Sequence, residues 1–178
     1  LYDEGTYTSL YSKKYYSSSK PLEVLTDLLK RIMISKAKYN VQETEETICS
    51  FFDDDYLYFQ KMALFVIAEN ADIYGRLFWN QLAHKDYKLI IEDLYFGDEM
   101  KHLLNNIKQF SVEQKGILKK IIEAGPVFFA VEEGDDENKY SARWKQKRYE
   151  ALIHEPEFKE LYESNKTISG VDVQLMPA

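Results

Sequence analysis

The segment from Tyr56 to Asn70, YLYFQKMALFVIAEN, constrains the fold of this chain more than any other, because it is apolar on nearly every side of a helix. A helix of this kind is stable only when neighbouring elements surround it. We therefore expect this helix, around Met62 to Ile67, to lie at the centre of the fold. Its neighbours should also be helices, since seven glycines and four prolines are too few for the tight turns of a sheet-rich protein.

Helical spacing recurs on both sides of this central segment. The apolar residues between Leu22 and Met33 predict an amphipathic helix from Pro21 to about Tyr39. The acidic run from Asp53 to Asp55 predicts a turn and a cap for the central helix. Further helices are expected over residues 41–52, 72–82, 84–97 (ending near Gly97), 98–110, 111–124, 140–153 and 156–164.

Two boundaries carry specific signals. Ser111 and Gln114 have the spacing of a capping box, and Gly125 followed by Pro126 should end the helix that begins there. The run PVFFAV, residues 126–131, is the one short β-like stretch. We expect it to form a helical turn, because no second convincing strand exists to pair with it.

The chain is long enough for one domain. We expect an extended or poorly ordered arm over residues 1–20, a single all-helical domain over 21–165 and an irregular tail over 166–178. The five tyrosines of the arm either cover the flank of the first helix or bind a partner. Six apolar positions of residues 63–82 match apolar positions 40 residues later, a period at the short end of the HEAT range, although chance similarity between helix pairs would look the same. The predicted fold is all-α, an irregular HEAT-like array of antiparallel helix pairs.

Composition argues against several classes of partner. The formal net charge of -7 repels nucleic acid and anionic lipid. No window approaches the length of apolar sequence that a membrane-spanning helix needs. The lone Cys49 lies in the apolar context TICSFF, which suits a reducing compartment, so we expect a cytoplasmic location. The start at Leu1 suggests a piece of a larger polypeptide, although proteolytic processing would look the same.

The pair Glu99 and His102 in GDEMKH has the Glu-x-x-His spacing of di-iron bundles. Such a site needs two of these pairs and further carboxylates, and neither His84 nor His154 has an acid three residues earlier. We therefore expect no metal site and interpret the pair as a surface or interface pair. The acidic clusters DDDYLY and DDENKY lack the glycine and glutamate of a calcium loop.

Signals of catalysis or cofactor binding are missing from the sequence. The glycines stand far apart and form neither of the standard nucleotide-binding motifs. No Gly-x-Ser-x-Gly motif occurs, and the apolar setting of Cys49 should blunt its reactivity. We therefore predict no catalytic residue and no cofactor.

The helix containing SARWKQKRYEAL carries the best candidate for a binding feature. Trp144 and Arg148 share a helical face, so a guanidinium stacked on an aromatic ring could meet an anionic partner. Alternatively, the positive charges complement the helix dipole and pair with the acids that precede them. The residues predicted to contact a partner are Trp144, Arg148, Tyr149, Arg143, His102 and Glu99.

Three stretches carry a resemblance to a known class of protein: YFQKMALFVIAENADIYGRLFW, DEMKHLLNNIKQFSVEQKGILKKIIEAGP and RWKQKRYEAL. Over residues 50–152 the chain resembles the helical-repeat, HEAT-like regions of large bacterial multidomain proteins, which commonly lie beside NTPase or effector modules in anti-phage defence systems. The resemblance rests on a pattern of helices. It implies a scaffold or sensor segment that packs against other domains or recognises a foreign protein, and it carries over no catalytic residue.

The functional hypothesis is protein recognition or domain coupling without chemistry of its own, with a protein partner or neighbouring domains of the same polypeptide as the ligand. Two alternatives stay open. One is a metal-dependent helical enzyme built on Glu99 and His102. The other is nucleic-acid binding through the basic helix at residues 143–149.

Overall fold

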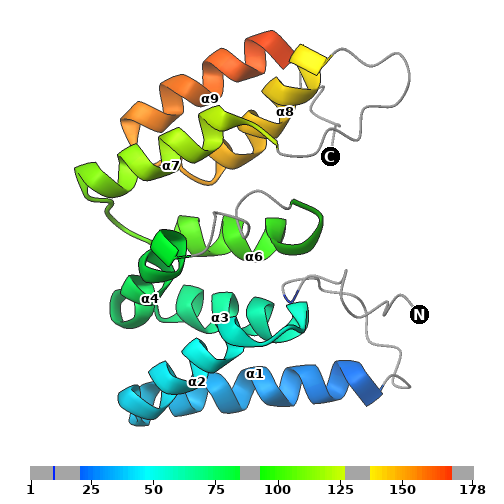
Figure 1. Cartoon of the computed structure of the whole chain (residues 1–178), viewed down its shortest axis with the longest axis vertical. Helices are drawn as coiled ribbons and strands as arrows, with labels where there is room; N and C mark the ends of the chain where they lie inside the picture. Colours follow the sequence, from blue (N-terminus) through cyan, green and yellow to red (C-terminus); the bar gives the residue numbers. More distant parts are fainter. Residues whose placement is uncertain (1–9, 11–20, 85–92, 127–136, 170–178) are drawn as a thin grey trace, which may run out of the picture. The chain divides into compact units, whose positions relative to one another are not determined.

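The computed structural model describes residue 10 and residues 21–84, 93–126 and 137–169, and within these ranges all regular structure is α-helical (Figure 1). The predicted all-α class is confirmed. The helices of the described residues are α1 (Pro21–Tyr39), α2 (Val41–Asp53), α3 (Leu57–Glu69), α4 (Ala71–His84), α6 (Asp93–Asn106), α7 (Val112–Ala124), α8 (Glu137–Glu150) and α9 (Pro156–Ser169).

The chain divides into two compact units, residues 1–109 and residues 110–178. The sequence predicted a single domain over residues 21–165, so the boundary at Gln109 and Phe110 was not foreseen. The tail predicted over 166–178 begins inside a helix, because α9 continues to Ser169. Apart from Leu10, the predicted arm lies outside the described residues, as does all of the PVFFAV run after Pro126.

The core of unit 1 is the α3 helix, as predicted. All residues from Lys61 to Ala68 are buried, and α3 contacts α1, α2, α4 and α6. The remaining apolar side chains of this core include Phe52, Phe78 and Leu103, which are at most 1% exposed. These four neighbouring helices cover the apolar surface of α3 and so make it stable in water.

Two predicted helix boundaries in unit 1 are corrected by the structure. Asp54 makes the expected turn before α3, with its Oδ1 accepting a hydrogen bond of 2.8 Å from the Tyr56 amide. It does not cap α3, whose N-cap residue is Tyr56 without a side-chain cap. Helix α6 runs unbroken through Gly97, where a helix end was predicted. A single glycine lowers helix propensity by only about 1 kcal/mol, which packing against α3 readily offsets.

Unit 2 contains α7, α8 and α9. The predicted capping box is present, with the Gln114 amide donating to Ser111 Oγ at 3.1 Å and the Ser111 amide donating to Gln114 Oε1 at 2.9 Å. Helix α7 ends as predicted at Gly125, whose φ of 80° is a backbone conformation that favours glycine. Helices α8 and α9 pack together through buried Tyr149 and Phe158, whose rings stack with centroids 5.9 Å apart.

Glu155, between α8 and α9, links the connection between these two helices to the first residues of unit 2. Its carboxylate pairs with Lys115 at 2.5 Å and accepts a 3.4 Å hydrogen bond from the Phe110 amide. The hydrogen bond from Lys115 lowers the pKa of Glu155 and outweighs burial, which raises it. The hydrogen bond from the Phe110 amide lowers the pKa of Glu155 further.

We predict that Glu155→Gln lowers the free energy of unfolding by about 1–2 kcal/mol at pH 7, because a charged hydrogen-bond acceptor is lost. A lowered folded-state pKa stabilises the protein above the unfolded pKa, about 4.3, and this contribution disappears as pH falls through the folded value. The difference between the variant and the unaltered chain should therefore shrink at pH 3. Urea unfolding at both pH values measures it.

The matched control is Glu157→Gln, which removes an exposed carboxylate 3.9 Å from Lys119. Exposed pairs contribute little, so a change below about 0.5 kcal/mol is expected. Equal losses for the two variants at pH 7 would contradict the role assigned to Glu155.

Contacts within each unit join neighbouring helices, such as α1 with α2 and α8 with α9. Such contacts are common to HEAT-like arrays and to other helical packings, so the predicted repeat stays a prediction. Among the described helices, none has the length and apolar character needed to cross a membrane.

Candidate functional site

The Glu99 and His102 side chains, predicted as a surface or interface pair, have different surroundings on α6. Glu99 is 1% exposed, and its Oε1 accepts a 2.6 Å hydrogen bond from the backbone amide of Leu10. His102 is partly exposed and pairs through Nε2 with Glu69 Oε1 at 3.1 Å. In the described ranges, no three His, Cys, Asp or Glu side chains gather in a way that could hold a metal ion. The structure therefore gives the two residues separate partners.

Glu99 belongs to a buried group of charges. Lys61 on α3 is only 2% exposed, and burial lowers the pKa of its amine, while the negative charges of Glu99 and Asp98 act to raise it. Lys30 on α1 shows the same balance. Burial lowers the pKa of Lys30, and the charges of Asp27, Glu99 and Glu69 oppose that shift. The negative charge of Glu99 thus makes two amines easier to keep inside a mostly apolar unit.

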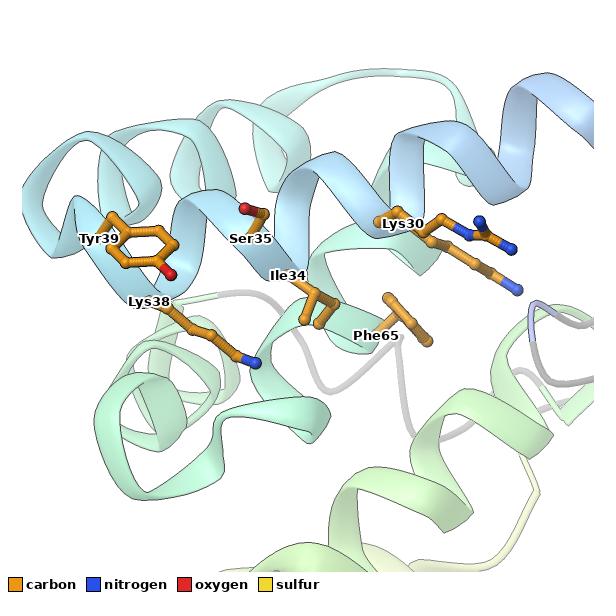
Figure 2. A pocket seen from close by; sticks show the side chains of 7 residues that line it. Lys30, Ile34, Ser35, Lys38, Tyr39 and Phe65 are labelled. Carbon is orange, nitrogen blue, oxygen red and sulfur yellow. The ribbon is translucent and has the colours of Figure 1, made fainter.

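Lys30 also lines a shallow pocket of about 400 Å³ on the side of α1 that faces Phe65 of α3 (Figure 2). Lys30 and Lys38 extend from opposite ends of this pocket, with Ile34 and Phe65 between them. Arg31, Ser35 and Tyr39 complete the lining. The pocket therefore combines three cationic side chains with an apolar and aromatic wall.

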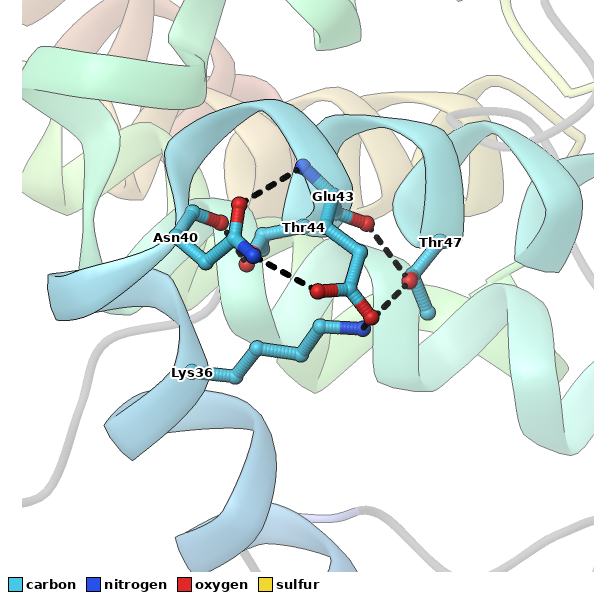
Figure 3. A network of polar contacts seen from close by, with 5 residues as sticks. All are labelled: Lys36, Asn40, Glu43, Thr44 and Thr47. Carbon is cyan, nitrogen blue, oxygen red and sulfur yellow. Dashed lines mark hydrogen bonds and ion pairs between the residues drawn. The ribbon is translucent and has the colours of Figure 1, made fainter.

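A polar network fixes the end of α1 beside this pocket (Figure 3). Asn40 caps α2, because its Oδ1 accepts from the Glu43 amide at 3.2 Å. Lys36 pairs with Glu43 at 2.8 Å and donates to Thr47 Oγ1 at 3.2 Å. These contacts join the last turn of α1 to the first turns of α2. They therefore hold in place the helix end that carries the pocket-lining residues Lys38 and Tyr39.

The exposed side of α1 carries a row of apolar side chains beside polar ones, which the prediction of an amphipathic helix did not anticipate. Met33 and Ala37 are buried, at 3% and 0% exposure, and form the inner face. Leu25, Leu28 and Ile32 nevertheless remain 61%, 52% and 51% exposed. These three residues are spaced three and four positions apart, so they form one stripe along the helix. Tyr39, which is 87% exposed, lies seven positions after Ile32 and continues the same stripe. We call Leu25, Leu28, Ile32 and Tyr39 the α1 stripe.

The predicted contact residues of α8 have internal partners. The Arg148 guanidinium lies 3.5 Å from the centroid of the Trp144 ring, so the predicted stack is present. Both side chains are buried, however, at 9% and 4% exposure, and Arg148 Nη1 also donates to the Trp144 carbonyl at 3.1 Å. A partner contact through this helix would therefore depend on the exposed side chains Arg143 and Lys147.

Tyr149, a further predicted contact residue, is fully buried. Its hydroxyl donates to Glu123 Oε1 at 2.5 Å, and Lys145 donates to Glu123 Oε2 at 2.8 Å. Burial and the neighbouring Glu123 charge raise the pKa of Tyr149 far above its ordinary value. Burial opposes ionisation of Glu123, but the hydrogen bonds from Lys145 and Tyr149 outweigh it and lower the pKa of that carboxyl. The hydrogen bonds from Lys145 and Tyr149 to Glu123 therefore link α8 to α7.

Sequence reasoning missed Lys30, Lys61, Leu10 and the α1 stripe. For Lys61 a signal was available, because it is the one charged residue between Leu57 and Ala68 in a helix predicted to be buried all round. A buried lysine needs a nearby negative charge, which Glu99 supplies from α6. No comparable signal marked Leu10.

Comparison of the chain with protein-family models, with curated proteins and with solved structures found no match.

Proposed function

We propose that this chain is a helical scaffold or protein-recognition segment of a larger bacterial protein, without chemistry of its own, and that the α1 stripe is its contact surface. The observation that carries the proposal is the exposure of Leu25, Leu28 and Ile32, each more than half open to solvent on one side of a single helix. Rows of this kind, at spacings of three and four, are the pattern through which helices pack on other helices. The resemblance to HEAT-like regions beside defence NTPases agrees with this role.

The partner that fits the surface is an amphipathic helix with acidic side chains beside its apolar face. Between Lys30 and Tyr39, α1 carries four basic residues and no acidic one, although the whole chain has a net charge of -7. Three of these bases line the pocket that flanks the stripe. An acidic partner would therefore find apolar area and complementary charge side by side.

The test uses a synthetic 18-residue helical peptide as a probe, with leucines along one face and glutamates beside them. Fluorescence anisotropy measures its binding to the full chain. The double variant Leu28→Ser and Ile32→Ser should weaken binding at least about tenfold, because each half-exposed side chain contributes on the order of 1 kcal/mol when it is covered. Lys38→Glu should also weaken binding and reduce its dependence on salt.

Val112→Ser provides the matched control, since Val112 is an exposed apolar residue of α7, 89% open to solvent. It should leave the affinity unchanged. A lysine version of the peptide that binds as well as the glutamate version would refute an acidic partner. Sedimentation of the chain alone covers the remaining alternative, because a dimer that the double variant abolishes would show that a second copy occupies the stripe instead.

A further inference from the structure

We propose that unit 1 contains a recognition site for a single aliphatic residue of a peptide segment, formed by Glu99 of α6 and Lys30 of α1, and that Leu10 of the chain itself occupies this site. The site is distinct from the α1 stripe and goes beyond the function proposed above. Its ligand is defined by chemistry: a backbone N–H, a backbone carbonyl and an aliphatic side chain presented together.

Each of these three features of Leu10 is met by unit 1. Its amide donates to Glu99 Oε1 at 2.6 Å, across 89 positions of sequence. The Leu10 carbonyl oxygen accepts a hydrogen bond from Lys30 Nζ. Leu10 as a whole is only 7% exposed. A carboxylate acceptor and an ammonium donor therefore hold the two polar groups of one residue while its side chain is covered. Charge-assisted bonds of this type are roughly twice as strong as neutral ones.

The burial of Glu99 indicates that the site is built into the core. A carboxylate that is 1% exposed is costly unless it is hydrogen-bonded and its charge is balanced. The Leu10 amide supplies the hydrogen bond, and the buried Lys61 with the half-buried Lys30 supplies positive charge. Within the described residues, Glu99 is thus held ready to accept from a main-chain N–H.

The occupant is tethered, because residues 11–20 join Leu10 to the start of α1. Because the contact is intramolecular, a free peptide competes poorly with the unaltered chain. Weakening the chain's own occupant should make the site available. A partner segment with an aliphatic residue could take the same place.

The experiment uses the full chain with Leu10→Asp and a fluorescent peptide of the sequence TYTSLYSKK, which copies residues 6–14. A buried aspartate beside Glu99 disfavours the chain's own contact. Anisotropy should show the peptide binding to this variant at least about tenfold more tightly than to the unaltered chain. A peptide with aspartate in place of its leucine should not bind.

Matched lysine variants on α1 identify the site. In the Leu10→Asp background, Lys30→Met should weaken peptide binding about tenfold, because the donor to the carbonyl is lost. Lys38→Met should not, since Lys38 lies eight positions, about two helical turns, farther along α1 than Lys30. Equal effects of the two lysine variants, or equal binding to the altered and unaltered chains, would overturn the proposal.

Hydrogen exchange provides a readout that does not depend on how the variants fold. In the unaltered chain, the Leu10 amide should exchange at least about tenfold more slowly than an unprotected amide, because it is buried and hydrogen-bonded. Exchange at the unprotected rate would show that Leu10 does not occupy the site. Leu10→Ala, a milder change, replaces Leu10→Asp in the peptide assay if circular dichroism shows that the aspartate variant loses helix.

Discussion

Replacing Glu99 by leucine should lower the free energy of unfolding by about 3–5 kcal/mol, the loss expected when one member of a buried charged group is removed. Two effects combine. The Leu10 amide loses its acceptor, and Lys61, 2% exposed, loses the largest of the negative charges that favour its ionised form. Urea unfolding followed by circular dichroism measures the change.

Glu46→Leu is the matched control, since Glu46 is exposed on α2 and its carboxylate accepts a long 3.4 Å hydrogen bond from Gln42. Its effect should stay within about 0.5 kcal/mol. If the two glutamate variants were equally stable, Glu99 would have no structural role in the core. A second variant, Lys61→Met, separates the two effects, because it removes the buried amine and leaves the acceptor of Leu10 in place.

Replacing Phe158 by alanine should destabilise unit 2 by about 3–5 kcal/mol, the range for truncating a buried aromatic side chain. Phe158 is fully buried on α9 and stacks on Tyr149 of α8. The truncation leaves a cavity between the two helices that form the most extensive pair of the unit. The expected result is an earlier unfolding transition.

The two tryptophans allow this change to be followed locally, because Trp79 lies in unit 1 and Trp144 in unit 2. In a Trp79→Phe background, fluorescence reports on unit 2 alone. Ile168→Ala on the same helix is the control, since Ile168 is 55% exposed and its truncation should cost below about 1 kcal/mol. A Phe158→Ala midpoint that matches the control would refute the packing described for α8 and α9.

Most helices were predictable because their signals are local. The capping box of α7 was found from the spacing of Ser111 and Gln114, and the end of α7 from Gly125, since both depend on residues within one turn. The end predicted at Gly97 was wrong for the opposite reason. Whether a glycine interrupts a helix depends on the packing around it, and α6 packs along α3.

The candidate site was less predictable than the helices. Trp144, Arg148 and Tyr149 were selected by residue type, and their type is equally suited to packing inside unit 2, where the structure finds their partners. Leu25, Leu28 and Ile32 share their type with core residues but lie exposed. Residue type alone does not distinguish these outcomes, because large amphipathic side chains suit interiors and interfaces alike.

By itself, the sequence determined that this protein is helical and that α3 lies at its core, because an unbroken apolar surface on one helix has to be covered from all sides. Only the tertiary structure decided that Glu99 faces inward to Leu10 and that one apolar stripe of α1 stays open. Those outcomes depend on which helices become neighbours, and neighbours 20 or 89 positions apart in the chain leave no periodic trace in either segment.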